Sequence, residues 1–185
     1  MLTEKQKKEK ISLMVEMATL GLSRGNHNLL FFDSRFLRVL EARGFFDKKR
    51  TVSRGGLMTV MRELDAGVQC NNFLKIYMRI SGAKLPLRRI DPFALYDTYT
   101  TYNTLFPSNA IEINHAVTLV NGLHLGKIAA SRCGSTCNEL FFSLSKCVRR
   151  ACANCRQISK TERAVREMFE AQDKKGSSKK KVCSA

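Results

Sequence analysis

The sequence predicts a mainly α-helical protein: a helical body, a small cysteine-rich module near the C-terminus, and a disordered basic tail. Three observations predict this class. Apolar residues recur at three- and four-residue steps through most of the first 130 positions. Five of the seven cysteines fall between positions 133 and 155. From Asp173 onward the composition is dominated by lysine, glycine and serine, which cannot bury a core. The expected domains are residues 1–130, 131–166 and 167–185.

Each expected helix of the body has apolar residues on one face and a breaking signal after it. The segment from Gly21 to Asn28, with two glycines and two asparagines, is expected to break the first helix. Asp91 supplies an N-cap, and Pro92 occupies the first helical position after it. The helices are expected over residues 4–22, 33–43, 56–66, 71–80, 92–106 and 111–130.

The charge balance favours a polyanionic partner. The chain has 32 Lys and Arg against 16 Asp and Glu, a formal net charge of +16, and a sequence pI near 9.9. Nucleic acid gains affinity from such a surface by releasing condensed counterions, and an anionic membrane surface is the main competitor. No apolar run of about 18 residues is present, and no apolar segment follows Met1–Lys8. We therefore expect no membrane partner, a cytoplasmic location and reduced thiols.

The cysteine spacing predicts a structural zinc site. Two short pairs, with three and two intervening residues, are separated by fourteen residues, which is typical of four-thiolate sites where each pair forms a small knuckle. Four protein ligands leave no open position, so the ion would not be catalytic. The Phe141–Phe142 pair is expected to pack beneath the metal. Reduced cysteines packed as small apolar residues are the alternative, and Cys147 is a rival ligand. The predicted ligands are Cys133, Cys137, Cys152 and Cys155.

Arginines near these cysteines are candidates for DNA contacts. A zinc ion would fix the loop from Ser131 to Gln157 so that guanidinium groups reach the phosphate backbone, which positions a protein without reading sequence. Arg54 is a further candidate, because it precedes the second of two helices that together resemble a helix-turn-helix over residues 33–64; an ordinary helical hairpin explains that pattern nearly as well. The candidates in the cysteine region are Arg132, Arg149, Arg150 and Arg156.

Other chemistry-bearing residues favour no catalytic function. Tyr96, Tyr99 and Tyr102 lie three residues apart and could stack single-stranded bases, although such a row more often packs on a neighbouring helix. The three histidines show no metal-ligand spacing and are expected to be structural. No phosphate-binding loop, dinucleotide fingerprint or HExxH motif is present, so we expect no enzyme.

With these residues in view, the chain resembles the FlhC family of bacterial transcriptional activators over most of residues 12–166. The resemblance rests on the order of several short pieces followed by the cysteine region. These pieces are Ala18–Gly21, Val52–Leu57 continuing to Arg62–Leu64, Ala116–Val120 and Arg163–Val165.

The resemblance implies a mostly helical subunit that assembles with a small helical FlhD-type partner, binds double-stranded promoter DNA and recruits RNA polymerase. It also implies one zinc ion on the four cysteines. The regulated genes would serve conjugative transfer of a mobile element or flagellum formation, and the basic tail favours the first. Two other functions stay open: an RNA-binding zinc-knuckle protein and a redox-sensing zinc regulator.

Overall fold

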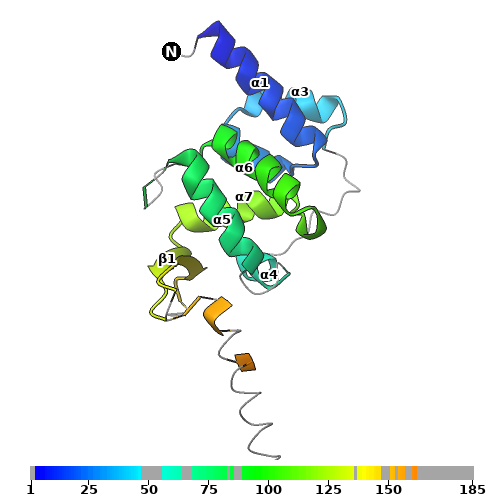
Figure 1. Ribbon diagram of the computed structural model, residues 1–185. Coiled ribbons are helices and arrows are strands. Elements are labelled where there is room, and N and C mark those ends of the chain that lie inside the picture. The colour runs from blue at the N-terminus through cyan, green and yellow to red at the C-terminus, as the bar shows by residue number, and fades with distance from the viewer. Residues whose placement is uncertain are drawn as a thin grey trace, which may run out of the picture.

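The computed structural model describes residues 3–46, 56–63, 68–82, 84–85, 89–135, 137–146, 151–152, 154–156 and 160–161 (Figure 1). The expected basic tail lies outside these residues. The described part is mainly helical, with one two-stranded sheet beside the cysteines. Its elements are α1 (Glu4–Thr19), α2 (Arg24–Phe31), α3 (Ser34–Ala42), α4 (Leu57–Glu63), α5 (Val68–Ser81), α6 (Pro92–Leu105), a 3-10 turn η2 (Pro107–Asn109), α7 (Ile113–His124), β1 (Ile128–Arg132) and β2 (Leu140–Leu144).

The helices begin where the sequence supplies a capping side chain. Thr3 accepts a hydrogen bond from the N–H of Gln6, whose side chain in turn accepts from the N–H of Thr3, so that α1 starts with a capping box. The Asp33 carboxylate caps α3, and Asp91 caps α6 as expected, with Pro92 in its first turn. These caps satisfy amide groups that have no partner inside the helix.

The expected break after the first helix is present, since α1 ends at Thr19, but a helix that was not predicted, α2, begins at Arg24 within Gly21–Asn28. The Ser23 side chain caps this helix by accepting from the N–H of Asn26. Asn114 of α7 holds the connection from the other side: its Oδ1 accepts from the N–H of Ser23 at 2.9 Å, and its Nδ2 donates to the Gly21 carbonyl at 2.9 Å. A tertiary contact thus stabilises a helix that local composition disfavours.

The expected helix over 111–130 is wrong in its last third. Helix α7 ends at His124, and Gly126 adopts a positive φ of 66° in the turn that follows. The chain then enters β1, so the expected domain boundary at residue 130 falls inside a strand. Ala129 and Ala130, both compatible with a helix, face Ser143 and Phe142 across an antiparallel ladder.

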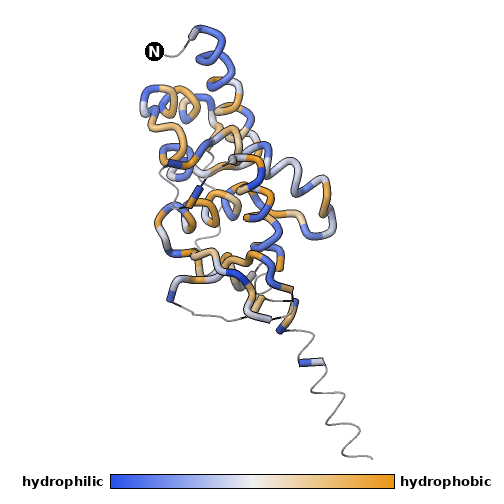
Figure 2. The backbone as a smooth tube through the Cα atoms, turned by 60° about the vertical axis from the view of Figure 1, so that its left-hand side comes forward, coloured by the Kyte–Doolittle hydropathy of each residue, from blue (hydrophilic) through white to orange (hydrophobic). Residues whose placement is uncertain are grey.

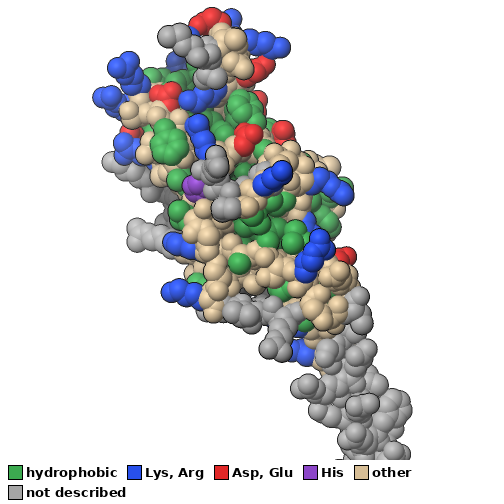
Figure 3. Space-filling model, turned by 90° about the vertical axis from the view of Figure 1, so that its left-hand side faces the viewer, with side chains coloured by type: hydrophobic (Ala, Val, Ile, Leu, Met, Phe, Trp, Pro, Cys, Tyr) green, Lys and Arg blue, Asp and Glu red, His purple; other side chains and the backbone are tan. Residues whose placement is uncertain are grey.

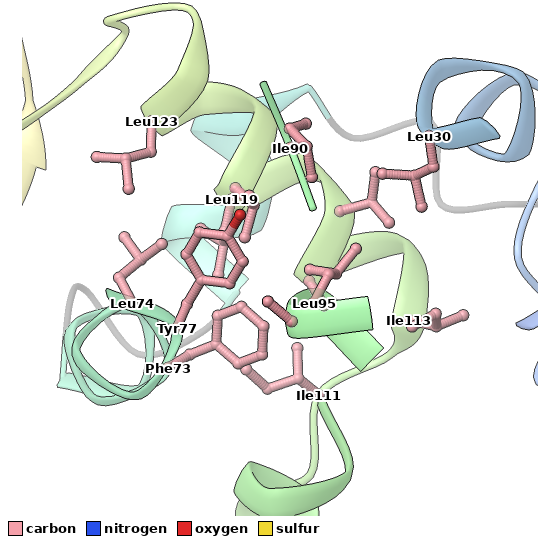
Figure 4. Packing of buried hydrophobic residues seen from close by; sticks show 14 of the residues in the cluster. Leu30, Phe73, Leu74, Tyr77, Ile90, Leu95, Ile111, Ile113, Leu119 and Leu123 are labelled. Carbon is pink, nitrogen blue, oxygen red and sulfur yellow. The ribbon is translucent and has the colours of Figure 1, made fainter. Parts of the chain in front are cut away.

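A single large core joins α5, α6 and α7, which pack against one another at the centre of the body (Figures 1 and 4). Phe73 and Tyr77 of α5 point from one side toward Leu95 of α6 and Leu119 of α7 (Figure 4). The Phe73 and Tyr102 rings meet edge to face with centroids 5.6 Å apart. Apolar stretches gather in this body, whereas the start of α1 is hydrophilic and projects from it (Figure 2). No helix in the described part is long and apolar enough to cross a bilayer.

Asn71 of α5 binds the two-stranded sheet to the helical body, beside the buried side chains of Ile128 and Phe142. The register pairs Ile128 with Leu144 and Arg132 with Leu140. On the outer edge of β2, the Nδ2 of Asn71 donates to the Phe142 carbonyl at 3.2 Å, and its Oδ1 accepts from the Phe142 N–H. The side-chain amide therefore occupies the place of a third strand, and α5 fixes the position of the sheet.

Candidate metal centre

The four predicted cysteines come together from two short loops at the end of the sheet. Cys133 follows β1 directly and Cys137 lies in the turn after it, while Cys152 precedes the helical residues 154–156 and Cys155 lies among them. The N–H of Cys133 donates to the Glu139 carbonyl at 2.9 Å, which closes the first loop. Asn138 reverses the chain there with a φ of 46°, a conformation that asparagine tolerates.

The sulfur atoms are as close as a shared metal ion requires. All four Sγ atoms lie within 4.8 Å of one another. Cys137 Sγ is 3.7 Å from Cys152 Sγ and 3.4 Å from Cys155 Sγ. A tetrahedral zinc with Zn–S bonds of about 2.3 Å would separate its sulfur ligands by about 3.8 Å. The four residues therefore could hold one metal ion.

Backbone amides point at the sulfur atoms. The N–H of Cys152 donates to Cys133 Sγ at 3.3 Å, and the N–H of Cys155 donates to Cys152 Sγ at 3.5 Å. Such donors stabilise a thiolate, and the bond from Cys152 is the main reason why the pKa of Cys133 falls to about 7. The Glu139 N–H also lowers the pKa of Cys137, but the neighbouring thiols, Cys155 foremost, raise it to about 12. The surroundings therefore favour the thiolate of Cys133 and the protonated thiol of Cys137.

The prediction that the Phe141–Phe142 pair packs beneath the cysteines is correct for Phe141 only. Consecutive residues of a strand point to opposite faces of a sheet. Phe141 is buried in a small cluster with Cys133 and Cys152, which are 2% and 8% exposed. Phe142 is buried in the large helical core. The pair therefore links the two clusters.

Basic side chains surround the cysteine cluster. Among the described residues from 125 to 161, Glu139 is the single acidic side chain, and Lys75 of α5 pairs with it at 2.8 Å. This ion pair lowers the pKa of the Glu139 carboxyl. Arg132 is exposed at the end of β1, and its guanidinium donates to the Asn138 carbonyl at 3.5 Å. Arg156 is half-buried.

Two further cations were missed by sequence reasoning, which considered arginines only. Lys127 and Lys146 are both exposed at the other end of the two-stranded sheet. The backbone joins Lys127 to Ser145, the residue before Lys146: the Ser145 N–H donates to the Lys127 carbonyl at 2.9 Å. The flanks of the predicted hairpin could have pointed to them. The predicted candidates Arg54, Arg149, Arg150 and the rival ligand Cys147 lie outside the described residues.

The pattern that resembled a helix-turn-helix over residues 33–64 does not form a packed pair of helices. Helix α3 packs against α2, whereas α4 packs against α7. The two helices lie at opposite ends of the body (Figure 1). Gly122 of α7 lets α4 pack closely against α7. A side-chain Cβ at this position would lie only 2.8 Å from Leu57 Cδ2, which is too close.

The tyrosine row serves packing. Tyr102 is buried, and Tyr96 and Tyr99 are half-buried against the large core, so the preferred interpretation is confirmed and no base-stacking platform is present at these three side chains. His27 is buried as well, with its Nε2 at 3.2 Å from the Met14 carbonyl, and burial lowers its pKa. Its structural role is confirmed.

Comparison with models of known protein families gives no match to this chain. Comparison with curated proteins gives no significant match either.

Proposed function

We propose that Cys133, Cys137, Cys152 and Cys155 hold one structural zinc ion in the DNA-binding subunit of an FlhDC-type transcriptional activator. In this proposal the chain assembles with a small helical FlhD-type subunit, binds promoter DNA and recruits RNA polymerase. Conjugative-transfer genes are the preferred targets, with flagellar genes second. The observation that carries the proposal is a four-thiol cluster set in a basic module.

The choice of zinc follows from the donor set. Four thiolates at tetrahedral spacing suit Zn²⁺, which has no geometric preference of its own and binds soft sulfur well. The ion would neutralise charge on the four sulfurs and fix the two loops to each other. Because all four ligands come from the protein, it would leave no position for a substrate.

The choice of nucleic acid follows from the charges around that cluster. The one acidic side chain described there is neutralised by Lys75, and the exposed cations Arg132, Lys127 and Lys146 have no carboxylate beside them among the described residues. Basic side chains also extend to this end on the face drawn in Figure 3, while most acidic ones gather toward the N-terminal end. A phosphate backbone is the natural partner for such a surface.

A partner subunit is supported by apolar side chains left on the surface. Phe32 is 70% exposed, and Leu105 and Met58 are more than half exposed. A groove of about 640 Å³ also runs between α1 and the start of α6, and Phe31 and Phe93 line it. A groove lined by such apolar side chains is a surface that a partner subunit could cover.

The proposal is tested with the zinc-loaded full chain and an FlhD-type partner, titrated against a labelled promoter duplex from 50 to 200 mM salt. We expect salt-dependent, sequence-preferring binding that R132Q weakens. R79Q removes an exposed charge from the end of α5 and is the control. No duplex binding, or a preference for single-stranded RNA, would reject the proposal.

One observation favours redox sensing as a second candidate. Cys137 is exposed, and its Sγ is 3.4 Å from that of Cys155, so an oxidant reaches a pair that is placed for a disulfide. Stoichiometric zinc release and a Cys137–Cys155 disulfide at low peroxide would support this function. Zinc that resists such treatment would exclude it.

A further inference from the structure

Helix α3 presents a basic face that the fold does not use. It is joined to α2 by Phe32 and Asp33 alone, and Leu37 and Leu40 are buried against the body. The opposite side of the helix is exposed. We call this side the α3 face, and it consists of Arg35, Arg38, Val39, Ala42 and Arg43.

The positive charge of the α3 face is not compensated. Both acidic groups of this segment are engaged elsewhere: the Asp33 carboxylate caps the helix and lies 4.0 Å from Lys10 Nζ, and Glu41 pairs with Arg24 at 3.4 Å. In the described part of the chain, none of the three arginines of the α3 face has an ion pair. Three guanidinium groups therefore face solvent together on a helix of nine residues.

We propose that the α3 face is a second contact with double-stranded DNA, separate from the cysteine module. This inference rests on the proposed function. A nine-residue helix is about 14 Å long and about 10 Å wide with its side chains, which fits the major groove of about 12 Å. Arginine is the side chain that most often reads guanine there and also binds phosphate, and Val39 offers an apolar contact of the kind a thymine methyl takes.

The shape of the α2–α3 unit agrees with this use. In DNA-binding proteins, two short helices joined by a tight turn commonly place the second helix in the major groove, while the first helix lies over the DNA backbone. Phe32 makes the turn possible with a φ of 51°, and the exposed residues of α2 include Arg24. In this proposal the helix pair that contacts DNA is α2 and α3, which begins earlier in the chain than the pattern over residues 33–64.

A membrane surface fits the α3 face less well. A helix that lies on a bilayer buries a broad apolar side among the lipids. In α3 that side is already occupied, since Leu37 and Leu40 pack on the body. The outward side offers three arginines against Val39 and Ala42.

The α3 face and the cysteine module lie at opposite ends of the molecule (Figure 1). One chain would therefore touch the duplex at two places, and each contact can be removed without the other. The test uses the zinc-loaded full chain with its FlhD-type partner on a promoter duplex. The variant R35Q/R38Q/R43Q removes the three charges and keeps good helix formers. The control K8Q/R79Q/K84Q removes three exposed charges elsewhere, none of which lines the groove between α1 and α6.

Removing three phosphate-directed charges should make the negative slope of log K against log salt shallower by about 2–3, and should weaken binding roughly 100-fold at 150 mM salt. The control should weaken binding less than about threefold, because its charges are screened from the duplex. In hydroxyl-radical footprints, R35Q/R38Q/R43Q should lose one of two protected patches, and R132Q should weaken the other.

The failures of the two proposals differ. If the wild-type chain binds no duplex, the proposed function falls and this inference with it. If the wild type binds and R132Q weakens binding while R35Q/R38Q/R43Q matches its control, only the α3 contact is refuted. If R35Q/R38Q/R43Q loses binding to phosphatidylserine vesicles while its DNA binding is unchanged, the α3 contact with DNA is likewise refuted and a membrane surface is favoured. Circular dichroism verifies that each variant keeps its helices.

Discussion

Metal removal should unfold the cysteine module and leave the helical body intact. The perturbation is C152S, or chelation of the wild type. Cys133, Phe141 and Cys152 form a small cluster of their own, and no helix of the large core contributes to it. The module therefore has little apolar surface with which to stay ordered once the sulfur atoms lose their shared ion.

The free energies involved support separate unfolding of the cysteine module and the helical body. Burying Phe141 contributes about 2–3 kcal/mol, whereas each ordered loop residue costs about 1–2 kcal/mol of backbone entropy. A structural zinc contributes about 10–16 kcal/mol in small peptides, so the ion would supply most of the free energy that keeps the module folded. The helical body should lose little stability, because its own core keeps Phe142 and the two bonds from Asn71 whether or not the metal is bound.

Hydrogen exchange read by mass spectrometry, with zinc content measured on the same sample, tests this prediction. The amides of Cys133 and Arg156, bonded to carbonyls of the module, should lose protection without metal. The amide of Phe142, bonded to Asn71, should keep it. C70A removes a buried core thiol and is the matched control: it should destabilise the body and retain zinc. Unchanged protection of Cys133 after complete metal loss would refute the reasoning.

Three further predictions concern buried polar groups. Burial lowers the pKa of His27 below its unfolded value of 6.5, so the unfolding free energy should fall as pH drops below that value, by at most about 1.4 kcal/mol per pH unit. Urea titrations of H27Q should show a shallower fall with pH than those of the wild type. N71L removes both bonds to Phe142 and should cost about 1–3 kcal/mol in urea unfolding; no loss would show that the clamp is dispensable. N103L removes the equivalent pair of bonds to Ile111 and should cost as much, yet only N71L should speed zinc loss to a chelator.

The fold class could be predicted because helical periodicity and capping residues are local signals. Asp91 and Pro92 start α6 where the sequence indicates. Helix α2 could not be predicted, since its stability depends on Asn114, which is distant in the sequence. The end of α7 was misplaced for a similar reason: Ala129 and Ala130 favour a helix locally, and only their pairing with β2 makes them a strand.

The cysteine site was predicted almost completely, because ligand spacing reflects the local geometry of a knuckle. Cys133 and Cys137 belong to the cluster although three residues separate them. The pairing of Lys75 with Glu139 and the role of Asn71 could not be read from the sequence, since the partners are 64 and 71 positions apart. The basic face of α3 was missed because burial of Leu37 and Leu40 decides which arginines are turned outward.

The register of β2 couples the metal site to the helical core. Phe142 is held by Asn71 and buried among the helices, and the adjacent Phe141 packs against the cysteines. A shift of one residue would exchange these faces, placing Phe142 on the thiols and Phe141 in the core. The asparagine clamp fixes the register from one side and the metal would fix it from the other. Any movement of α5, whether by mutation or by a partner subunit, would therefore be transmitted through Phe142 and Phe141 to the end of β1, where Arg132 lies.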